Sequence, residues 1–325
     1  MVTTPHTFIC SLASIASLLL LSVSASFAGF GGHNMKGDFG VLSASQPPPG
    51  FYAVAPIYYR YEADTLRDRD GNKVIIDPQE RGSLEANAYI FGFIWVSEMK
   101  LFGANYSFQI YPAFTDNTLE APILGLNESV GTDLTDLYFQ PVNLGWHTDR
   151  ADFIAGLGVY APTGEYENGG SSNNGLGMWS LEFFAGATLY FDEAKSWHFS
   201  TNAYYETHSE KKDSDITVGD ILTLEGGLGK SYMDGALTVG AAYYAQWKVT
   251  EDDIPSLELL PGGRDVGKHR VYGIGPDVTL PLATSKKLYG FLNARYFWEF
   301  GAESTFEGQS LVVTLTFPIP SVALQ

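Results

Sequence analysis

The stretch "LYGFLNARYFWEFGAE" (residues 288–303) places Arg295 and Glu299 in a run that is otherwise apolar and aromatic. Side chains alternate across a β-strand, so every second residue shares a face. The face with both charges consists of Tyr289, Phe291, Asn293, Arg295, Phe297 and Glu299. The opposite face, from Leu288 to Phe300, is wholly apolar. Such a strand needs an apolar medium on one side and a wet or hydrogen-bonded space on the other. A soluble sandwich and a membrane barrel both supply this.

The amino-terminal sequence favours export. The apolar run "FICSLASIASLLLLSVSASFA" (8–28) ends in a small-x-small pattern that predicts signal-peptidase cleavage after Ala28. A retained anchor is the alternative, but the run is shorter and richer in serine than a spanning helix of about 20 residues. Cys10, the only cysteine, lies inside this segment, so a mature chain without disulfides must depend on its sheet. We interpret 1–28 as a signal peptide, 29–49 as a Gly/Pro-rich leader and 50–325 as the folded domain.

Apolar and polar residues alternate almost continuously from Phe51 onward. The pattern predicts strands at 51–63, 84–97, 103–113, 134–146, 151–162, 177–192, 196–207, 219–232, 236–248, 268–282, 287–300 and 309–318. Aromatic residues such as Trp179 and Phe191 stand at both ends of the apolar faces, and short connections take turns with long ones. These features are typical of outer-membrane proteins. The sequence therefore predicts an all-β fold, a transmembrane antiparallel β-barrel of about 12 strands.

The long connections, taken as 64–83, 114–136, 163–176, 207–220, 249–267 and 300–309, hold most of the net charge of −18. An acidic crown of loops repels nucleic acid. Its carboxylates either bind divalent cations that bridge to lipid phosphates or are simply solvated.

Polar and aromatic residues on the inward faces are the candidate site. We expect a lumen charge network of Arg60, Glu182, Glu225, Arg270, Arg295 and Glu299. It either braces the wall or contacts a ligand. We also expect a lumen aromatic lining of Tyr58, Tyr89, Tyr160, Tyr190, Tyr204 and Tyr244. Tyrosine offers a ring face to an apolar guest and a hydroxyl to a polar one, although simple filling of the lumen is the alternative. Tyr204 and Tyr244 are expected to form a constriction near the external end.

Signals for catalysis or metal binding are weak. Asp68, Asp70 and Asn72 have calcium-loop spacing, but Lys73 stands where the loop needs glycine. The six histidines are scattered without an HExxH motif or a cysteine partner. Neighbours on one strand face, such as His198 and Ser200, lie roughly 7 Å apart, too far for direct proton transfer. We therefore expect no enzyme activity, no cofactor and no metal.

Several phrases together resemble one protein family. They are "PPPGFYAVAPIYYRYEADTLRDRDGNKV" (47–74), "DLYFQPVNLGWH" (136–147), "APTGEY" (161–166), "MWSLEFFAG" (178–186) and "WEFGAESTFEGQSLVVTLTFP" (298–318). In this order they resemble the phenol meta-cleavage-pathway outer-membrane transporter family over about residues 47–318. The resemblance implies a barrel that passes hydrophobic or aromatic compounds. One departure is that the chain continues past Phe317 with "PIPSVALQ", whereas outer-membrane strands commonly finish at an aromatic residue.

Together these observations predict a monomeric channel in the outer membrane of a Gram-negative bacterium. Its expected partners are outer-membrane lipid, lipopolysaccharide and small hydrophobic or aromatic solutes taken up passively. A non-conducting structural or surface-interaction barrel is the first alternative, and a soluble secreted sandwich is the second.

Overall fold

The computed structural model describes residues 31–73, 83–121, 126–168, 170, 172–233, 236–254, 268–285 and 287–320. The predicted signal peptide, with Cys10, lies outside these residues. The strands are β1 (Gly50–Arg67), β2 (Ser83–Leu101), β3 (Ala104–Tyr111), β4 (Ala113–Ala121), β5 (Leu126–Leu134), β6 (Leu137–His147), β7 (Ala151–Ala161), β8 (Ser180–Tyr190), β9 (Trp197–His208), β10 (Ile221–Tyr232), β11 (Leu237–Lys248), β12 (Arg270–Thr284), β13 (Lys287–Glu303) and β14 (Thr305–Ile319). Within the described residues no helix is long and apolar enough to cross a membrane.

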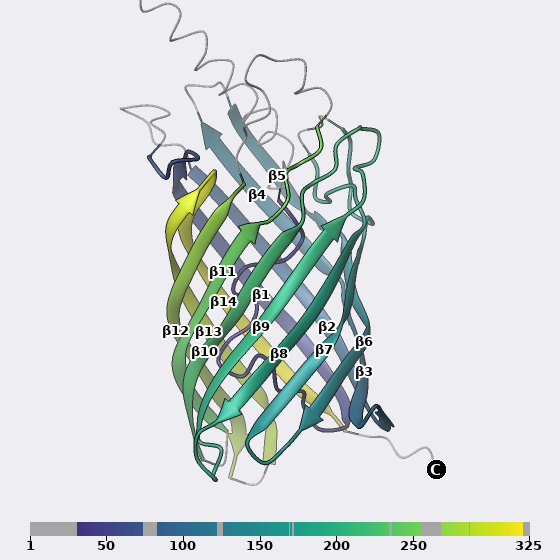
Figure 1. Cartoon of the computed structure of the whole chain (residues 1–325), viewed down its shortest axis with the longest axis vertical. Coiled ribbons are helices and arrows are strands. Elements are labelled where there is room, and N and C mark those ends of the chain that lie inside the picture. Colours follow the sequence, from purple (N-terminus) through teal and green to yellow (C-terminus); the bar gives the residue numbers. More distant parts are fainter. Residues whose placement is uncertain are drawn as a thin grey trace, which may run out of the picture.

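The strands form one antiparallel sheet that closes on itself (Figure 1). Closure comes from β1, which pairs with β14 along one edge and with β2 along the other. Twelve strands build the barrel, and β4 and β5 are two extra strands that extend it at one end. The predicted all-β barrel of about 12 strands is confirmed.

Side-chain alternation along the wall follows the predicted faces. On β8, Leu181 and Phe183 are exposed on the outer surface, while the alternating residues Glu182 and Phe184 are buried inside. The opening stretch behaves in the same way, because Arg295 and Glu299 are buried and Trp298 is exposed. An outer surface of large apolar side chains is what a lipid environment requires.

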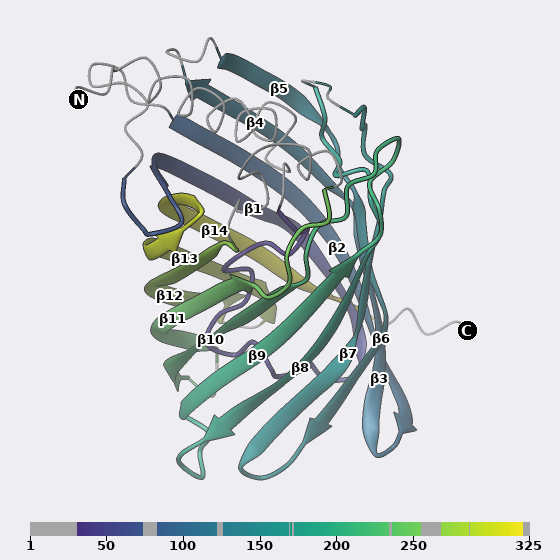
Figure 2. The same cartoon turned by 45° about the horizontal axis from the view of Figure 1, so that its top comes forward.

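Two connections differ from the prediction. The segment 114–136, expected to be a loop, contains β4 and the paired strand β5. Its sequence lacks an apolar face, and the hairpin continues beyond the end of the barrel (Figure 2). The segment 300–309, also expected to be a long loop, is a tight turn at Ser304, where the backbone has a positive φ of 51°. In both segments, strand pairing extends beyond the apolar residues from which the strand ends were predicted.

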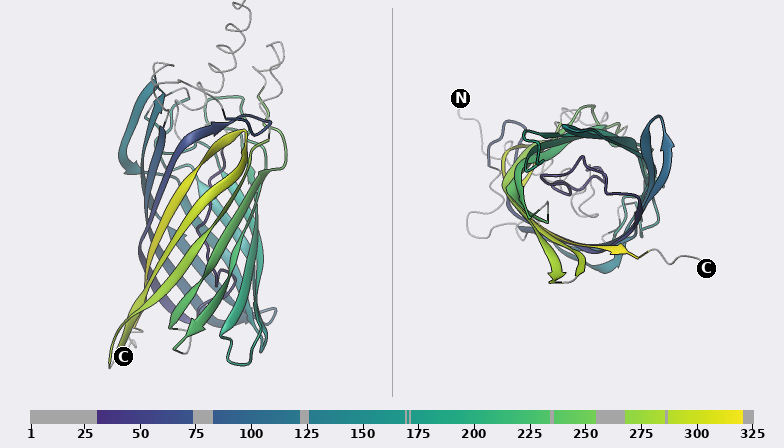
Figure 3. Two further views of the ribbon diagram at one scale, coloured as in Figure 1. Left: turned by 90° about the vertical axis from the view of Figure 1, so that its left-hand side faces the viewer. Right: turned by 90° about the horizontal axis from the view of Figure 1, so that it is seen from below.

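The leader passes through the inside of the barrel. Viewed along the barrel, residues 31–49 lie within the ring of strands (Figure 3). Wall glycines make room for this segment: a Cβ added at Gly227, Gly229 or Gly240 would come within 2.7–3.0 Å of Val41 side-chain atoms. The leader is thus packed against the wall.

Candidate functional site

Wall carboxylates hold the leader mainly through its backbone. Six of them accept hydrogen bonds from it: Asp152, Glu182, Glu206, Glu225, Asp277 and Glu299. Glu225 accepts from the N–H of Gly37 at 2.7 Å and of Phe39 at 2.9 Å. Asp277 accepts from the N–H of Val41 at 3.0 Å. A charged acceptor satisfies backbone donors that would otherwise lack partners inside the barrel.

One buried ion pair joins the leader to β13. Lys36 Nζ lies 2.5 Å from Glu299 Oε1, and the Glu299 side chain is fully buried. The hydroxyls of Tyr61 and Tyr244 donate to the same carboxylate at 2.7 and 2.8 Å. These donors compensate much of the cost of burying a carboxylate.

The predicted charge network is divided between two faces of the wall. Four of its members lie in the lumen, namely Glu182, Glu225, Arg295 and Glu299. Arg60 and Arg270 lie on the outer face, so their predicted inward orientation is wrong. Arg60 pairs with Glu62 and Glu85 there, and Arg270 pairs with Glu303. The polar residues of β1 suggested that the face with Arg60 points inward. In the structure the inward face of β1 instead carries Tyr59 and Tyr61, which pack in the interior.

The predicted aromatic lining is divided in the same way. Tyr58 and Tyr89 lie together on the outer face, with ring centroids 5.4 Å apart and the rings tilted by 34°, which corrects their predicted position. The other four tyrosines point inward: Tyr160, Tyr190, Tyr204 and Tyr244. Tyr160 and Tyr204 line the main cavity described below. Tyr204 stacks on Phe39 of the leader with ring centroids 5.3 Å apart. Tyr190 and Tyr244 instead hydrogen-bond to carboxylates of the wall.

A cavity of about 520 Å³ lies between the leader and the wall. Side chains of β1, β2 and β3 form an apolar side: Val54, Ile57, Tyr59, Ala88, Ile90, Ile94 and Tyr111. Met35 and Phe39 of the leader also line it, and so does Arg295. An enclosed apolar space of about 150 Å³ can hold one benzene molecule. The lumen therefore has room for a small aromatic or aliphatic solute beside the leader.

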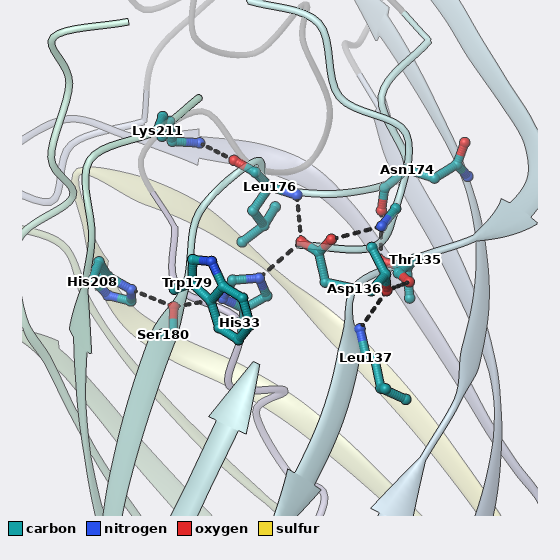
Figure 4. A network of polar contacts seen from close by, with 12 residues as sticks. His33, Thr135, Asp136, Leu137, Asn174, Leu176, Trp179, Ser180, His208 and Lys211 are labelled. Atoms are coloured by element: carbon teal, nitrogen blue, oxygen red, sulfur yellow. Dashed lines mark hydrogen bonds and ion pairs between the residues drawn. The ribbon is translucent and has the colours of Figure 1, made fainter. Parts of the chain in front are cut away.

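A polar cluster fixes the leader near the long-loop end of the barrel (Figure 4). His33 Nε2 lies 2.9 Å from Asp136 Oδ2, and its Nδ1 lies 2.7 Å from Ser180 Oγ. Glu206 accepts from the backbone N–H of His33 at 2.6 Å and of Asn34 at 3.1 Å. The cluster ties the start of the described leader to β8 and β9.

Burial and nearby charges shift the pKa values of two groups at this end of the barrel. Burial lowers the pKa of His33, but contacts with Asp136 and Glu206 outweigh it and raise that pKa above its ordinary value. Burial lowers the pKa of Lys211, in the loop after β9, to about 8. Lys211 Nζ donates to the carbonyl of Leu176 at 3.3 Å.

Sequence reasoning missed the leader as a functional element. Residues 29–49 were assigned only as a Gly/Pro-rich segment, and their contacts are made largely by backbone N–H groups, which every non-proline residue carries. Among the wall residues, Asp277 and Asp152 were also missed. The six charges expected in the lumen were three glutamates and three arginines, which balance one another and so indicated no further partner.

A family model described as "Putative MetA-pathway of phenol degradation" matches residues 63–315. The chain belongs to this family. Its fold is also that of the COG4313 outer membrane channel from Pseudomonas putida F1, with 14% identity, 88% of this chain and 100% of that chain covered, and a TM-score of 0.72. More distant are a FadL homologue from Pseudomonas aeruginosa (10% identity, 83% and 90% covered, TM-score 0.41) and the CymD monoaromatic hydrocarbon channel (7%, 85% and 90%, 0.44). A comparison with curated proteins finds no significant match. The protein is therefore a closed antiparallel β-barrel of this family.

Proposed function

We propose that the protein is an outer-membrane channel for passive uptake of small hydrophobic or aromatic compounds. The observation that carries this proposal is the cavity of about 520 Å³ inside the barrel, with an apolar side built by β1 to β3. Family membership points in the same direction. Cavities of about 300–1,000 Å³ with mostly apolar walls and few polar groups are typical binding sites for small molecules.

The arrangement suits transient binding. Apolar side chains and the rings of Tyr160 and Tyr204 offer contact area, while Arg295 and Asn293 offer hydrogen bonds at the cavity wall. A channel must bind its solute well enough to admit it and weakly enough to release it. The leader narrows the lumen, so we propose that it must shift for a solute to pass.

Further features of the proposal concern cell biology. We propose that the signal peptide is cleaved after Ala28, that the chain is a monomer and that its long loops face outward among lipopolysaccharide. Long loops lie outside in outer-membrane barrels generally. Transport without catalysis is the proposed activity, since no reaction chemistry is needed for it.

The test measures uptake by cells that lack other porins, because a phospholipid bilayer alone already admits phenol and toluene. Ala88→Trp fills the cavity, because Ala88 lines it and is buried. We expect this variant to slow entry of phenol or toluene without reducing the amount of folded barrel. The matched control is Ala155→Trp, on the outer face of β7. A sugar of similar size distinguishes selectivity from general porin behaviour, and equal slowing of sugar and aromatic would refute the aromatic preference.

One observation favours the alternative of a non-conducting barrel, namely the leader that traverses the lumen. If cells with the wild-type protein, cells with the Ala88→Trp variant and cells without the barrel take up phenol equally, this alternative replaces the channel.

A further inference from the structure

Three ligand-bearing side chains from distant parts of the sequence meet at the upper end of the lumen. His33 comes from the leader, while Glu206 and His208 come from the end of β9. One ligand atom from each lies within 4.8 Å of the others. Glu206 Oε1 is 3.5 Å from His33 Nδ1 and 3.7 Å from His208 Nδ1.

These separations are close to those of a zinc site. Zinc binds histidine nitrogen and carboxylate oxygen at about 2.0–2.2 Å in tetrahedral geometry, which places neighbouring ligand atoms about 3.3–3.5 Å apart. The two distances to Glu206 are at most a few tenths of an ångström wider, and the ligand atoms of His33 and His208 lie within 4.8 Å of each other, so the two imidazoles must move closer together around an ion. Ser180 Oγ lies between the two imidazoles, 2.7 Å from His33 Nδ1 and 2.8 Å from His208 Nδ1. Figure 4 shows both hydrogen bonds. They are shorter than the distance between two zinc ligands, so the Ser180 side chain must turn aside when an ion binds, and a water then takes the fourth position.

The surroundings orient the ligands. His33 Nε2 faces Asp136 Oδ2 at 2.9 Å, which leaves Nδ1 directed at the cluster. Ligating histidines commonly donate their second ring nitrogen to a carboxylate in this way. Asp136 itself accepts from the backbone N–H groups of Gly164 and Leu176 at 2.9 and 2.7 Å. Asn34 N donates to the second oxygen of Glu206.

Burial separates this cluster from an ordinary group of surface acids. The side chains of Glu206 and His208 are 1% and 0% exposed. Among the described residues, His208 Nε2 has no hydrogen-bond partner. Two nitrogen ligands favour zinc and its neighbours over calcium or magnesium, which prefer all-oxygen sites. The sequence predicted no metal site, because histidines 33 and 208 become neighbours only when the leader enters the barrel.

We propose that His33, Glu206 and His208 form a binding site for one divalent transition-metal ion of the zinc type, which fastens the leader to the barrel wall. The proposed metal site depends only on the geometry of these residues. Its consequence, that bound metal holds the leader in the lumen and closes the channel, rests on the proposed transport function.

The experiment uses the full mature protein in detergent, freed of metal with EDTA and titrated with Zn²⁺ by calorimetry or with Co²⁺ by visible absorption. We expect one ion per chain and the strong absorption of tetrahedral Co²⁺. Asp136→Asn is expected to weaken binding about 10- to 100-fold, as loss of an orienting carboxylate does. His33→Asn and Glu206→Gln are expected to weaken it at least as much. The control is His147→Asn, because His147 Nδ1 also lies beside a carboxylate, 3.1 Å from Asp152, at the other end of the barrel.

The possible outcomes distinguish metal binding from its proposed effect on the channel. Absence of stoichiometric binding, or equal binding by wild type and His33→Asn, would overturn the proposal. His33 belongs to the leader, so this variant stays informative even if wall variants fail to fold, which heat-modifiable migration reveals. Zn²⁺ should lower single-channel conductance in wild type and leave His33→Asn unchanged. Ligand-dependent binding without any change in conductance would refute the link to closure while supporting the site. A barrel that binds Zn²⁺ but never admits phenol would refute the proposed function alone.

Discussion

Glu225→Gln tests whether wall carboxylates hold the leader in the lumen. Glu225 is fully buried and accepts two backbone N–H groups, from Gly37 and Phe39. The amide keeps one acceptor oxygen and turns an NH₂ group toward the other donor. A hydrogen bond to a charged group contributes about 1.5–3 kcal/mol. Because a neutral amide costs less to bury, part of this loss is offset, and we expect docking of the leader to weaken by about 1.5–2 kcal/mol.

This free energy corresponds to a roughly 10- to 30-fold shift toward the undocked leader. Two assays report it. Planar-bilayer recordings should show a larger share of time in high-conductance states. The single cysteine of the chain lies at position 10, in the predicted signal, so Ser43→Cys supplies a unique thiol whose maleimide labelling should accelerate by a similar factor. Glu62→Gln is the matched control, because Glu62 pairs with Arg60 on the outer face.

Deleting residues 31–46 sets the upper limit of both signals. If the deletion raises conductance and Glu225→Gln changes neither conductance nor labelling, the carboxylate does not anchor the leader. If the deletion itself leaves conductance unchanged, the leader does not restrict the lumen and the reasoning fails at its first step.

Three further predictions concern the lipid-facing wall, the packing of Val41 against Gly229, and the loop that carries Lys211. Ala294 is exposed on the outer face near the middle of β13, so Ala294→Arg should cost about 2–4 kcal/mol of folding free energy. Asn293 lines the cavity, so Asn293→Arg should be tolerated. Heat-modifiable migration in urea measures both effects. Gly229→Val fills the groove that Val41 occupies and should increase labelling of the leader without unfolding the barrel; unchanged labelling would contradict the packing. Lys211 has its pKa lowered to about 8 by burial, so the unfolded chain binds its proton more tightly, and stability rises with pH between about 8 and 10.5. This rise in stability, up to about 3.5 kcal/mol at 1.4 kcal/mol per pKa unit, should be missing in Lys211→Met, and parallel pH profiles of the two proteins would refute it.

Much of the barrel could be predicted from alternation alone. Lipid demands an unbroken apolar face, so strands such as β8 and β11 carry a pattern that no loop imitates. The alternation disappears where a strand no longer contacts lipid. In β4 and β5, beyond the barrel rim, neither face must be apolar, and the sequence there looks like a loop. On β1, tyrosines suit both the interior and the interface, so alternation could not assign Tyr58 and Arg60 to the outer face.

The interior was less predictable, because its main partner carries no periodic signal. Wall carboxylates were visible in the sequence, and cross-strand ion pairs were the natural expectation for them. Instead their hydrogen bonds go largely to the leader, where donors such as Gly37 N–H depend on backbone geometry rather than residue type. A leader rich in glycine and serine can approach the wall closely, and its composition alone resembles an unstructured linker.

The docked leader explains why the described lumen can hold more buried acids than bases. A buried carboxylate without donors is costly, and Arg295 alone could not compensate Glu182, Glu225, Asp277 and Glu299. The leader supplies N–H groups and Lys36 to the same carboxylates, so the charged wall is stable with the leader docked. When the leader leaves, water must replace these donors, and the lumen becomes hydrated. The same carboxylates can therefore be satisfied either by a docked leader or by water in an open path, which is the pair of states that the proposed gated channel requires.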